Sequence, residues 1–149
     1  MTRSSILVVD DEKAVRTALN VNLKKHGLNV ELAASSHEAL EILGERPFDL
    51  VLSDVKMPDG TGLELLTKVR SAWPDTQVVI MTGYGSIVDA VTAIKAGAAD
   101  YIIKPIEKDE LFIILERALE RRNLRSEVRQ LRAKVTERFG FHNLVGSSS

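Results

Sequence analysis

The stretch ILVVDD, residues 6–11, runs four aliphatic residues directly into two adjacent carboxylates. An apolar run without a break is typical of a parallel strand that is covered on both faces. Asp10 and Asp11 therefore fall where this predicted strand ends. Because like charges held close together repel each other, the stretch predicts a buried strand and, at its end, a site that needs a positive partner.

The same pattern of a short apolar run followed by a helical stripe repeats over the first hundred residues. Further strands are predicted at residues 30–33, 50–53, 78–81 and 101–103. Apolar residues recur at helical spacing between these runs, as expected for amphipathic helices. A fifth helix is predicted to begin near Glu107 and to bury Leu111, Ile114, Leu115 and Ala118.

Local signals mark several helix ends. Ser35 followed by Glu38 predicts a capping box at the start of the second helix. Gly27, Gly44 and Gly97 follow the first, second and fourth helical patterns and are predicted to be C-terminal caps.

Five strand–helix units predict an α/β fold of the (βα)5 kind. Right-handed crossovers limit the topology to a doubly wound parallel sheet, for which the flavodoxin-like strand order 2-1-3-4-5 is the usual solution. In such sheets, ligands lie beyond the carboxyl ends of the strands. We therefore expect the acids that follow the strands to share one rim.

Length and composition limit the other possibilities. With 149 residues, the chain is long enough for one domain and a modest extension. The net charge of −1 argues against general affinity for nucleic acids or membranes. The absence of cysteine excludes disulfides and thiolate metal sites, and no apolar run approaches the length of a membrane span. A cytoplasmic protein is expected.

Polar residues follow four of the predicted strands. Asp10 and Asp11 end the first, Asp54 the third and Thr82 the fourth, while Lys104 follows the fifth. Taken singly, an Asp after a strand is more often the N-cap of the next helix, a Thr can be a turn hydroxyl, and a Lys can be a solvated charge. Together, three carboxylates on one rim predict a bound cation.

The donor types indicate which cation and which chemistry. Oxygen ligands without a histidine cluster favour Mg²⁺, with Lys104 as a second positive charge. A carboxylate flanked by Mg²⁺, an ammonium group and a hydroxyl is suited to accept a phosphoryl group, with Asp54 as the nucleophile. Asp10 and Asp11 would hold the metal for it.

Three segments resemble the receiver domain of two-component response regulators. They are VVDDE (8–12), LVLSDVKMPDGTGLELL (50–66) and VVIMTGYGSIVDAVTAIKAGAADYIIKP (78–105), and the resemblance covers residues 5 to about 120. It implies a phosphoacceptor that is modified by a sensor histidine kinase, and no turnover enzyme. It also implies a cis peptide bond before Pro105. The residue roles that it implies are Asp54 as phosphoacceptor, Asp10, Asp11, Asp54 and the backbone carbonyl of Lys56 as Mg²⁺ ligands, Thr82 and Lys104 as phosphoryl contacts, and Thr82 with Tyr101 as the switch pair.

Two other functions would be compatible with a similar fold or with similar site residues. A haloacid-dehalogenase-like phosphatase also has an Asp nucleophile, Mg²⁺ and Lys, but it requires an acid two residues after the nucleophile, where this chain has Lys56. A flavin-binding module requires a loop rich in Ser, Thr and Gly after the first strand. The loop DDEK, residues 10–13, repels phosphate instead.

The C-terminal part predicts a linker and the start of another domain. No Gly or Pro occurs between Pro105 and Gly140, so one helix is predicted over residues 107–138. We expect a receiver domain over residues 1–120, a helical coiled-coil linker over 121–139 and the start of a truncated ATPase domain over 140–149. The linker seam contains Leu124, Val128, Leu131 and Val135. A homodimer through this linker and the surface of helix 4, strand 5 and helix 5 is predicted.

The tail also indicates a subfamily. FHNLVGSSS, residues 141–149, resembles the opening of the central ATPase domain of σ54-dependent transcription activators. No G-x-x-x-x-G-K-[ST] motif occurs in the sequence, so the expected ATPase and DNA-binding domains lie outside this chain. Arg117, Arg121, Arg125 and Arg129 recur every four residues; a solvated face is the simplest interpretation, and direct nucleic-acid binding is not expected.

Overall fold

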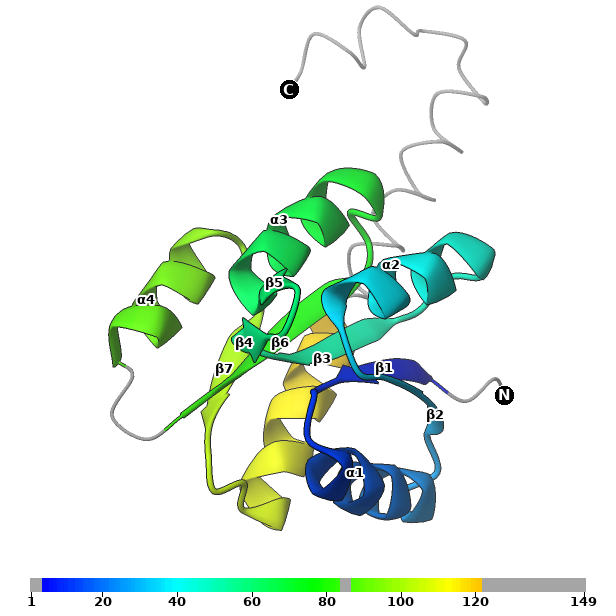
Figure 1. Ribbon diagram of the computed structural model, residues 1–149. Coiled ribbons are helices and arrows are strands. Elements are labelled where there is room, and N and C mark those ends of the chain that lie inside the picture. Colours follow the sequence, from blue (N-terminus) through cyan, green and yellow to red (C-terminus); the bar gives the residue numbers. More distant parts are fainter. Residues whose placement is uncertain (1–3, 84–86, 122–149) are drawn as a thin grey trace, which may run out of the picture.

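The computed structural model describes residues 4–83 and 87–121, which form a layered α/β domain (Figure 1). Its central sheet has five strands in the order β2-β1-β3-β6-β7, and every neighbouring pair is parallel. The strands are β1 (Ser5–Val9), β2 (Asn29–Ala33), β3 (Leu50–Asp54), β6 (Gln77–Thr82) and β7 (Asp100–Ile103). The predicted α/β class and the predicted order of the five main strands are confirmed.

Helices cover both faces of this sheet. They are α1 (Lys13–Lys25), α2 (Ser36–Glu45), α3 (Gly62–Ala72), α4 (Ile87–Lys95) and a helical segment over residues 108–121. Figure 1 shows α2, α3 and α4 on one face of the sheet, and α1 with the segment 108–121 on the other. One core cluster joins alternate strand residues to α2, α3 and α4, and the other joins the remaining strand residues to α1 and the segment 108–121. The continuous apolar runs are explained by this burial on both faces, since β3 and β6 are buried along their whole length.

The helix ends confirm most of the predicted caps. The Ser35 hydroxyl accepts a hydrogen bond from the Glu38 backbone N–H at the start of α2. Gly27 and Gly97 follow α1 and α4 with φ values of 88° and 107°, which favour glycine. The prediction for Gly44 is wrong, because α2 continues through this residue to Glu45 and Arg46 is its C-cap.

Two features between β3 and α3 were not predicted as strands. β4 (Lys56–Met57) and β5 (Gly60–Thr61) pair in antiparallel fashion and form a small hairpin directly after Asp54. The Thr61 hydroxyl then accepts a hydrogen bond from the Glu64 backbone N–H and caps α3. The chain that follows Asp54 is therefore ordered up to the next helix.

The last described helix confirms the predicted buried stripe. Residues 108–121 are helical, and their buried apolar side chains are Leu111, Ile114, Leu115 and Ala118. The predicted linker over 121–139, with its seam at Leu124, Val128, Leu131 and Val135, lies outside the described residues apart from position 121, as do Arg125, Arg129 and the segment 140–149. Among the described residues, no helix is both long enough and apolar enough to cross a membrane.

Candidate functional site

The carboxyl ends of four strands place the predicted site residues on one rim. Asp10 follows β1, Asp54 and Thr82 end β3 and β6, and Lys104 follows β7. Backbone hydrogen bonds extend the strand pairing to this rim: Asp10 N donates to Ala33 O at 3.1 Å, and Lys104 N donates to Thr82 O at 2.8 Å. The sheet register therefore fixes the backbone of each functional residue before any side-chain contact is considered.

Lys104 joins the first and third strands through its side chain. Its Nζ donates to Asp10 Oδ2 at 2.8 Å and to Asp54 Oδ2 at 3.0 Å. The Asp10 side chain is fully buried, and that of Asp54 is 11% exposed. Burial acts to lower the pKa of Lys104, but the hydrogen bonds from its ammonium group to Asp10 and Asp54 outweigh this effect and raise the pKa. Lys104 therefore supplies a positive charge between the two carboxylates.

A second acidic group forms where β1 leads into α1. Oxygen atoms of Asp10, Asp11 and Glu12 all lie within 4.8 Å of one another, and Asp11 and Glu12 are exposed. Asp10 Oδ1 also accepts a hydrogen bond from Glu12 N at 2.9 Å. Glu12 was not predicted as a site residue, although it directly follows Asp10 and Asp11 in the sequence. Asp54 is not part of this tight group; its link to Asp10 runs through Lys104.

The backbone around Asp54 is closely packed. Lys56 N–H donates to Asp54 Oδ1 at 3.3 Å, and Ser53 Oγ donates to the Asp54 carbonyl at 3.0 Å. Gly62, at the start of α3, packs so closely that an added Cβ would lie 2.2 Å from Asp54 O. Ser53 and Gly62 thus lie against the Asp54 backbone carbonyl, and Lys56 N–H contacts its carboxylate.

Thr82 adds a polar atom that has no partner in the part of the chain described. The residue is fully buried, and its Oγ1 makes no hydrogen bond there. A buried hydroxyl without a partner is costly, so it is rarely left unpaired without a role. Its position at the end of β6 makes it available to a group that binds at the rim.

The donor set at the rim fits a hard divalent cation. Asp10, Asp11 and Asp54 offer carboxylate oxygens, and Lys56, on β4, offers a backbone carbonyl close in sequence to Asp54. Oxygen ligands with an exposed side open to water suit Mg²⁺. Asp11 supplies that exposed side, because it is the solvent-facing member of the acid pair.

Tyr101 lies apart from this rim. It sits in β7, two residues before the strand end, and is 37% exposed. The peptide bond between Lys104 and Pro105 is cis, as the resemblance implied. A switch role for Tyr101 stays a prediction.

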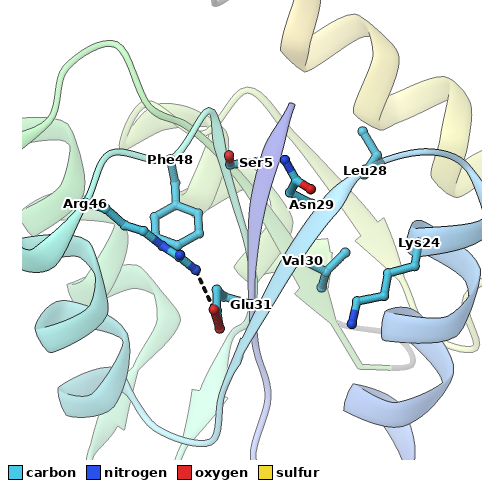
Figure 2. A pocket seen from close by; sticks show the side chains of 8 residues that line it. All are labelled: Ser5, Lys24, Leu28, Asn29, Val30, Glu31, Arg46 and Phe48. Carbon is cyan, nitrogen blue, oxygen red and sulfur yellow. Dashed lines mark ion pairs between the residues drawn. The ribbon is translucent and has the colours of Figure 1, made fainter. Parts of the chain in front are cut away.

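Two of the hollows in the described part of the chain differ in their distance from the rim. A groove of about 340 Å³ between α1 and residues 104–111 borders Lys104, and apolar side chains such as Val15, Leu19 and Ile106 line it. Another hollow, of about 400 Å³, surrounds the edge strand β2 at the opposite end of the sheet (Figure 2). Figure 2 shows Arg46 paired with Glu31 on one side of β2 and Lys24 on the other. Of these two hollows, the first adjoins the rim through Lys104 and the second contains no rim residue.

Comparison with known proteins gives consistent matches. Residues 6–116 match the response regulator receiver domain family. A putative response regulator NtrX-like of Rickettsia felis is 40% identical over 151 residues, covering 100% of this chain and 31% of the relative. Response regulator protein PilR of Pseudomonas aeruginosa is 39% identical and covers 85% of this chain and 28% of the relative.

Solved structures agree with these matches. NtrX from Brucella abortus in complex with ATP superposes with a TM-score of 0.83 at 36% identity, covering 87% of this chain and 30% of that one. The chain therefore spans about a third of the length of such relatives. The family match includes every rim residue from Asp10 to Lys104, and the identities to relatives exceed 30%. This chain belongs to the response regulator receiver domain family.

Proposed function

We propose that Asp54 accepts a phosphoryl group from a phosphohistidine of a sensor kinase. The observation that carries this proposal is the Lys104 ammonium group, which lies within 3.0 Å of oxygens of both Asp10 and Asp54. This contact brings together acids that are 44 positions apart in the sequence. It also leaves a cation beside the carboxylate that is to become phosphorylated.

The transfer needs little covalent chemistry from the protein. An Asp54 oxygen attacks phosphorus, a P–O bond forms as the P–N bond to the histidine breaks, and the imidazole leaves with the bonding electrons and takes up a proton. Lys104 neutralises charge on the phosphoryl oxygens, and Thr82 Oγ1 donates a hydrogen bond to one of them. When bound by Asp10, Asp11, Asp54 and the Lys56 carbonyl, Mg²⁺ supplies further charge neutralisation.

Phosphatase turnover is the main alternative for an Asp nucleophile near Lys and Mg²⁺. It requires a general acid to protonate the leaving group. The residue two positions after Asp54, where the general acid would be required, is Lys56. Its side chain is exposed and ends in an ammonium group, not in a carboxylic acid. We therefore expect a modified protein that loses its phosphate by its own hydrolysis, and no turnover of phosphate esters.

The groove between α1 and residues 104–111 is our proposed docking place for the kinase. It borders Lys104, and its α1 side is formed by small or apolar residues, among them Ala14 and Ala18, which are exposed. A helix of the kinase seated here would bring its histidine toward Asp54. Ala18→Glu should then slow transfer from the kinase while leaving transfer from a small phosphodonor unchanged.

A homodimer is the proposed output of the switch. Six of the seven large apolar side chains found exposed in the described residues lie on α4, β7 and the helical segment 108–121. β7 is the edge strand, with α4 on one face of the sheet and the segment 108–121 on the other (Figure 1). They are Val88, Val91, Ile94, Tyr101, Ile103 and Ile113. Their concentration around one edge of the sheet supports a protein contact there. Movement of Thr82 toward the phosphoryl group, followed by Tyr101, would rearrange this surface.

The complete regulator is proposed to be a cytoplasmic σ54-dependent transcription activator. Support comes from its relatives: this chain covers 31% of the ZraR protein of Salmonella typhimurium, described as a transcriptional regulatory protein. Brucella abortus NtrX has been crystallised with ATP and with ADP. An ATPase domain and a DNA-binding domain are thus proposed beyond this chain.

The direct test uses a small phosphodonor such as acetyl phosphate. With Mg²⁺ present, intact-mass measurement should show the addition of one phosphoryl group, and Asp54→Ala should abolish it. Thr82→Ala, which removes the proposed hydrogen bond to the phosphoryl group, should slow the addition. If the Asp54→Ala variant still gains the same mass, Asp54 is not the acceptor.

A further inference from the structure

Asp59 makes a long-range contact that the proposed phosphoryl transfer does not use. It lies in the turn between β4 and β5, five residues after Asp54. Its Oδ1 accepts a hydrogen bond from Ser36 N at 3.0 Å, and its Oδ2 accepts one from His37 N at 2.8 Å. Both donors belong to the first turn of α2, more than twenty positions earlier in the sequence. The hairpin that follows Asp54 is therefore attached to the N-terminus of another helix.

The electrostatics of this attachment favour the ionised carboxylate. The first N–H groups of a helix have no partner within the helix, and the helix dipole attracts negative charge there. The hydrogen bond from His37 N is the largest cause that lowers the pKa of Asp59, and together with the hydrogen bond from Ser36 N it outweighs the opposing effect of desolvation. Asp59 is therefore ionised at neutral pH, and each of its two carboxylate oxygens accepts a hydrogen bond.

The same end of α2 has a second, local cap. Ser35 Oγ accepts a hydrogen bond from Glu38 N at 3.2 Å. Together, Ser35 and Asp59 pair the backbone N–H groups of residues 36, 37 and 38. The two caps differ in one respect: Ser35 connects the helix only to itself, while Asp59 connects it to the hairpin beside Asp54.

The hairpin transmits this attachment to the site. Lys56 pairs with Thr61 across β4 and β5, and Gly62 N donates to Val55 O at 2.7 Å. The hairpin is thus closed at its base, next to Asp54, and attached at its tip by Asp59. Lys56 lies between these two points, and its N–H donates to Asp54 Oδ1 at 3.3 Å.

We propose that Asp59 is a positioning residue for the phosphoacceptor site: by attaching the hairpin tip to the N-terminus of α2, it fixes the Lys56 backbone beside Asp54. The Lys56 N–H then stays directed at the Asp54 carboxylate, and the Lys56 carbonyl stays where a metal at the rim would use it. This role rests on the proposed function, because the carbonyl matters only if the rim binds Mg²⁺.

Matched variants separate positioning from simple helix capping. Asp59→Ala and Ser35→Ala each remove a cap from the same end of α2, so both should lower the thermal stability. Only Asp59→Ala releases the hairpin. It should weaken Mg²⁺ binding, measured by calorimetry with Mg²⁺ alone, by about tenfold or more, as for other residues that orient metal ligands. Ser35→Ala should change the affinity by less than about twofold.

Amide hydrogen exchange gives a readout that does not depend on metal or phosphate. Exchange at Lys56 and Met57 should accelerate in Asp59→Ala and stay as in the wild type in Ser35→Ala. Asp59→Asn keeps one acceptor oxygen and should give an intermediate result, and it serves in place of Asp59→Ala if that variant does not fold.

The failure of this inference can be told apart from failure of the proposed function. If the wild type binds no Mg²⁺ and takes no phosphate, the proposed function is wrong, and amide exchange alone then decides whether Asp59 fixes the hairpin. Equal effects of Asp59→Ala and Ser35→Ala on exchange would overturn the inference. Unchanged Mg²⁺ affinity in Asp59→Ala, with a wild type that binds Mg²⁺, would also overturn it.

Discussion

Gly62 offers a sharp test of how closely the chain packs around Asp54. A Cβ at this position would lie 2.2 Å from the Asp54 carbonyl oxygen and 3.0 Å from Val55 Cα. Both neighbours are backbone atoms, so no side chain can rotate away. In Gly62→Ala, the start of α3 must therefore move away from β3 by about 1 Å to reach ordinary van der Waals contact. That movement would also stretch the 2.7 Å hydrogen bond from Gly62 N to Val55 O.

The expected cost follows from these two effects. Forcing an extra methyl group into a packed site costs about 1–3 kcal/mol, and weakening a buried backbone hydrogen bond costs about 1 kcal/mol. Gly62→Ala should therefore lower the free energy of unfolding by about 2–4 kcal/mol. For a domain of this size, that corresponds to a fall in Tm of roughly 5–15 °C.

Gly44 is the matched control. It lies in α2, and an added Cβ there would meet no atom within 4 Å. Because alanine is the better helix former, Gly44→Ala should leave stability unchanged or raise it by up to about 1 kcal/mol. Urea unfolding followed by the fluorescence of Trp73, the only tryptophan, measures both variants. A Gly62→Ala protein as stable as Gly44→Ala would refute the packing described at Asp54.

Further predictions concern Lys104, the apolar edge and phosphoryl transfer. Lys104→Met leaves the carboxylates of Asp10 and Asp54 without their cation and should lower the free energy of unfolding at neutral pH by about 3 kcal/mol. Because the pKa of Lys104 is raised above 10.5, its stabilising contribution is complete below pH 10.5 and is lost as the pH rises through the folded-state pKa. The wild type and Lys104→Met should therefore converge in urea titrations at high pH; a constant difference would contradict this. In light scattering, Ile113→Glu should abolish the proposed dimer, whereas Val21→Glu, which changes an exposed apolar residue of α1, should not. A wild type that stays monomeric with and without phosphate would contradict the dimer.

The sheet was predictable because its strands are buried on both faces. Runs such as residues 6–9 and 78–81 are apolar without interruption, so a few consecutive residues are enough to predict each strand. The end of α2 was not predictable in the same way. Gly44 lies inside the helix and does not adopt the positive φ of Gly27 and Gly97, and the chain leaves the helix only at Arg46.

The rim residues were predictable for a different reason: the carboxyl ends of parallel strands must meet. That rule places Asp10, Asp54 and Lys104 together without any knowledge of side chains. It says nothing about Asp59, whose partners in α2 lie more than twenty positions away. In the sequence, Asp59 is indistinguishable from an ordinary turn residue, since Asp is common in turns.

The acids that follow β1 and the acid that ends β3 should form one cation site. Calorimetric titration with Mg²⁺ measures it most directly, in the wild type and in Asp11→Asn, Asp54→Asn and Glu45→Gln, the last of which changes an exposed acid at the end of α2. Each Asp variant should weaken Mg²⁺ binding at least tenfold, and Glu45→Gln should leave it unchanged. Equal affinity in all four proteins, or no binding by the wild type, would contradict it.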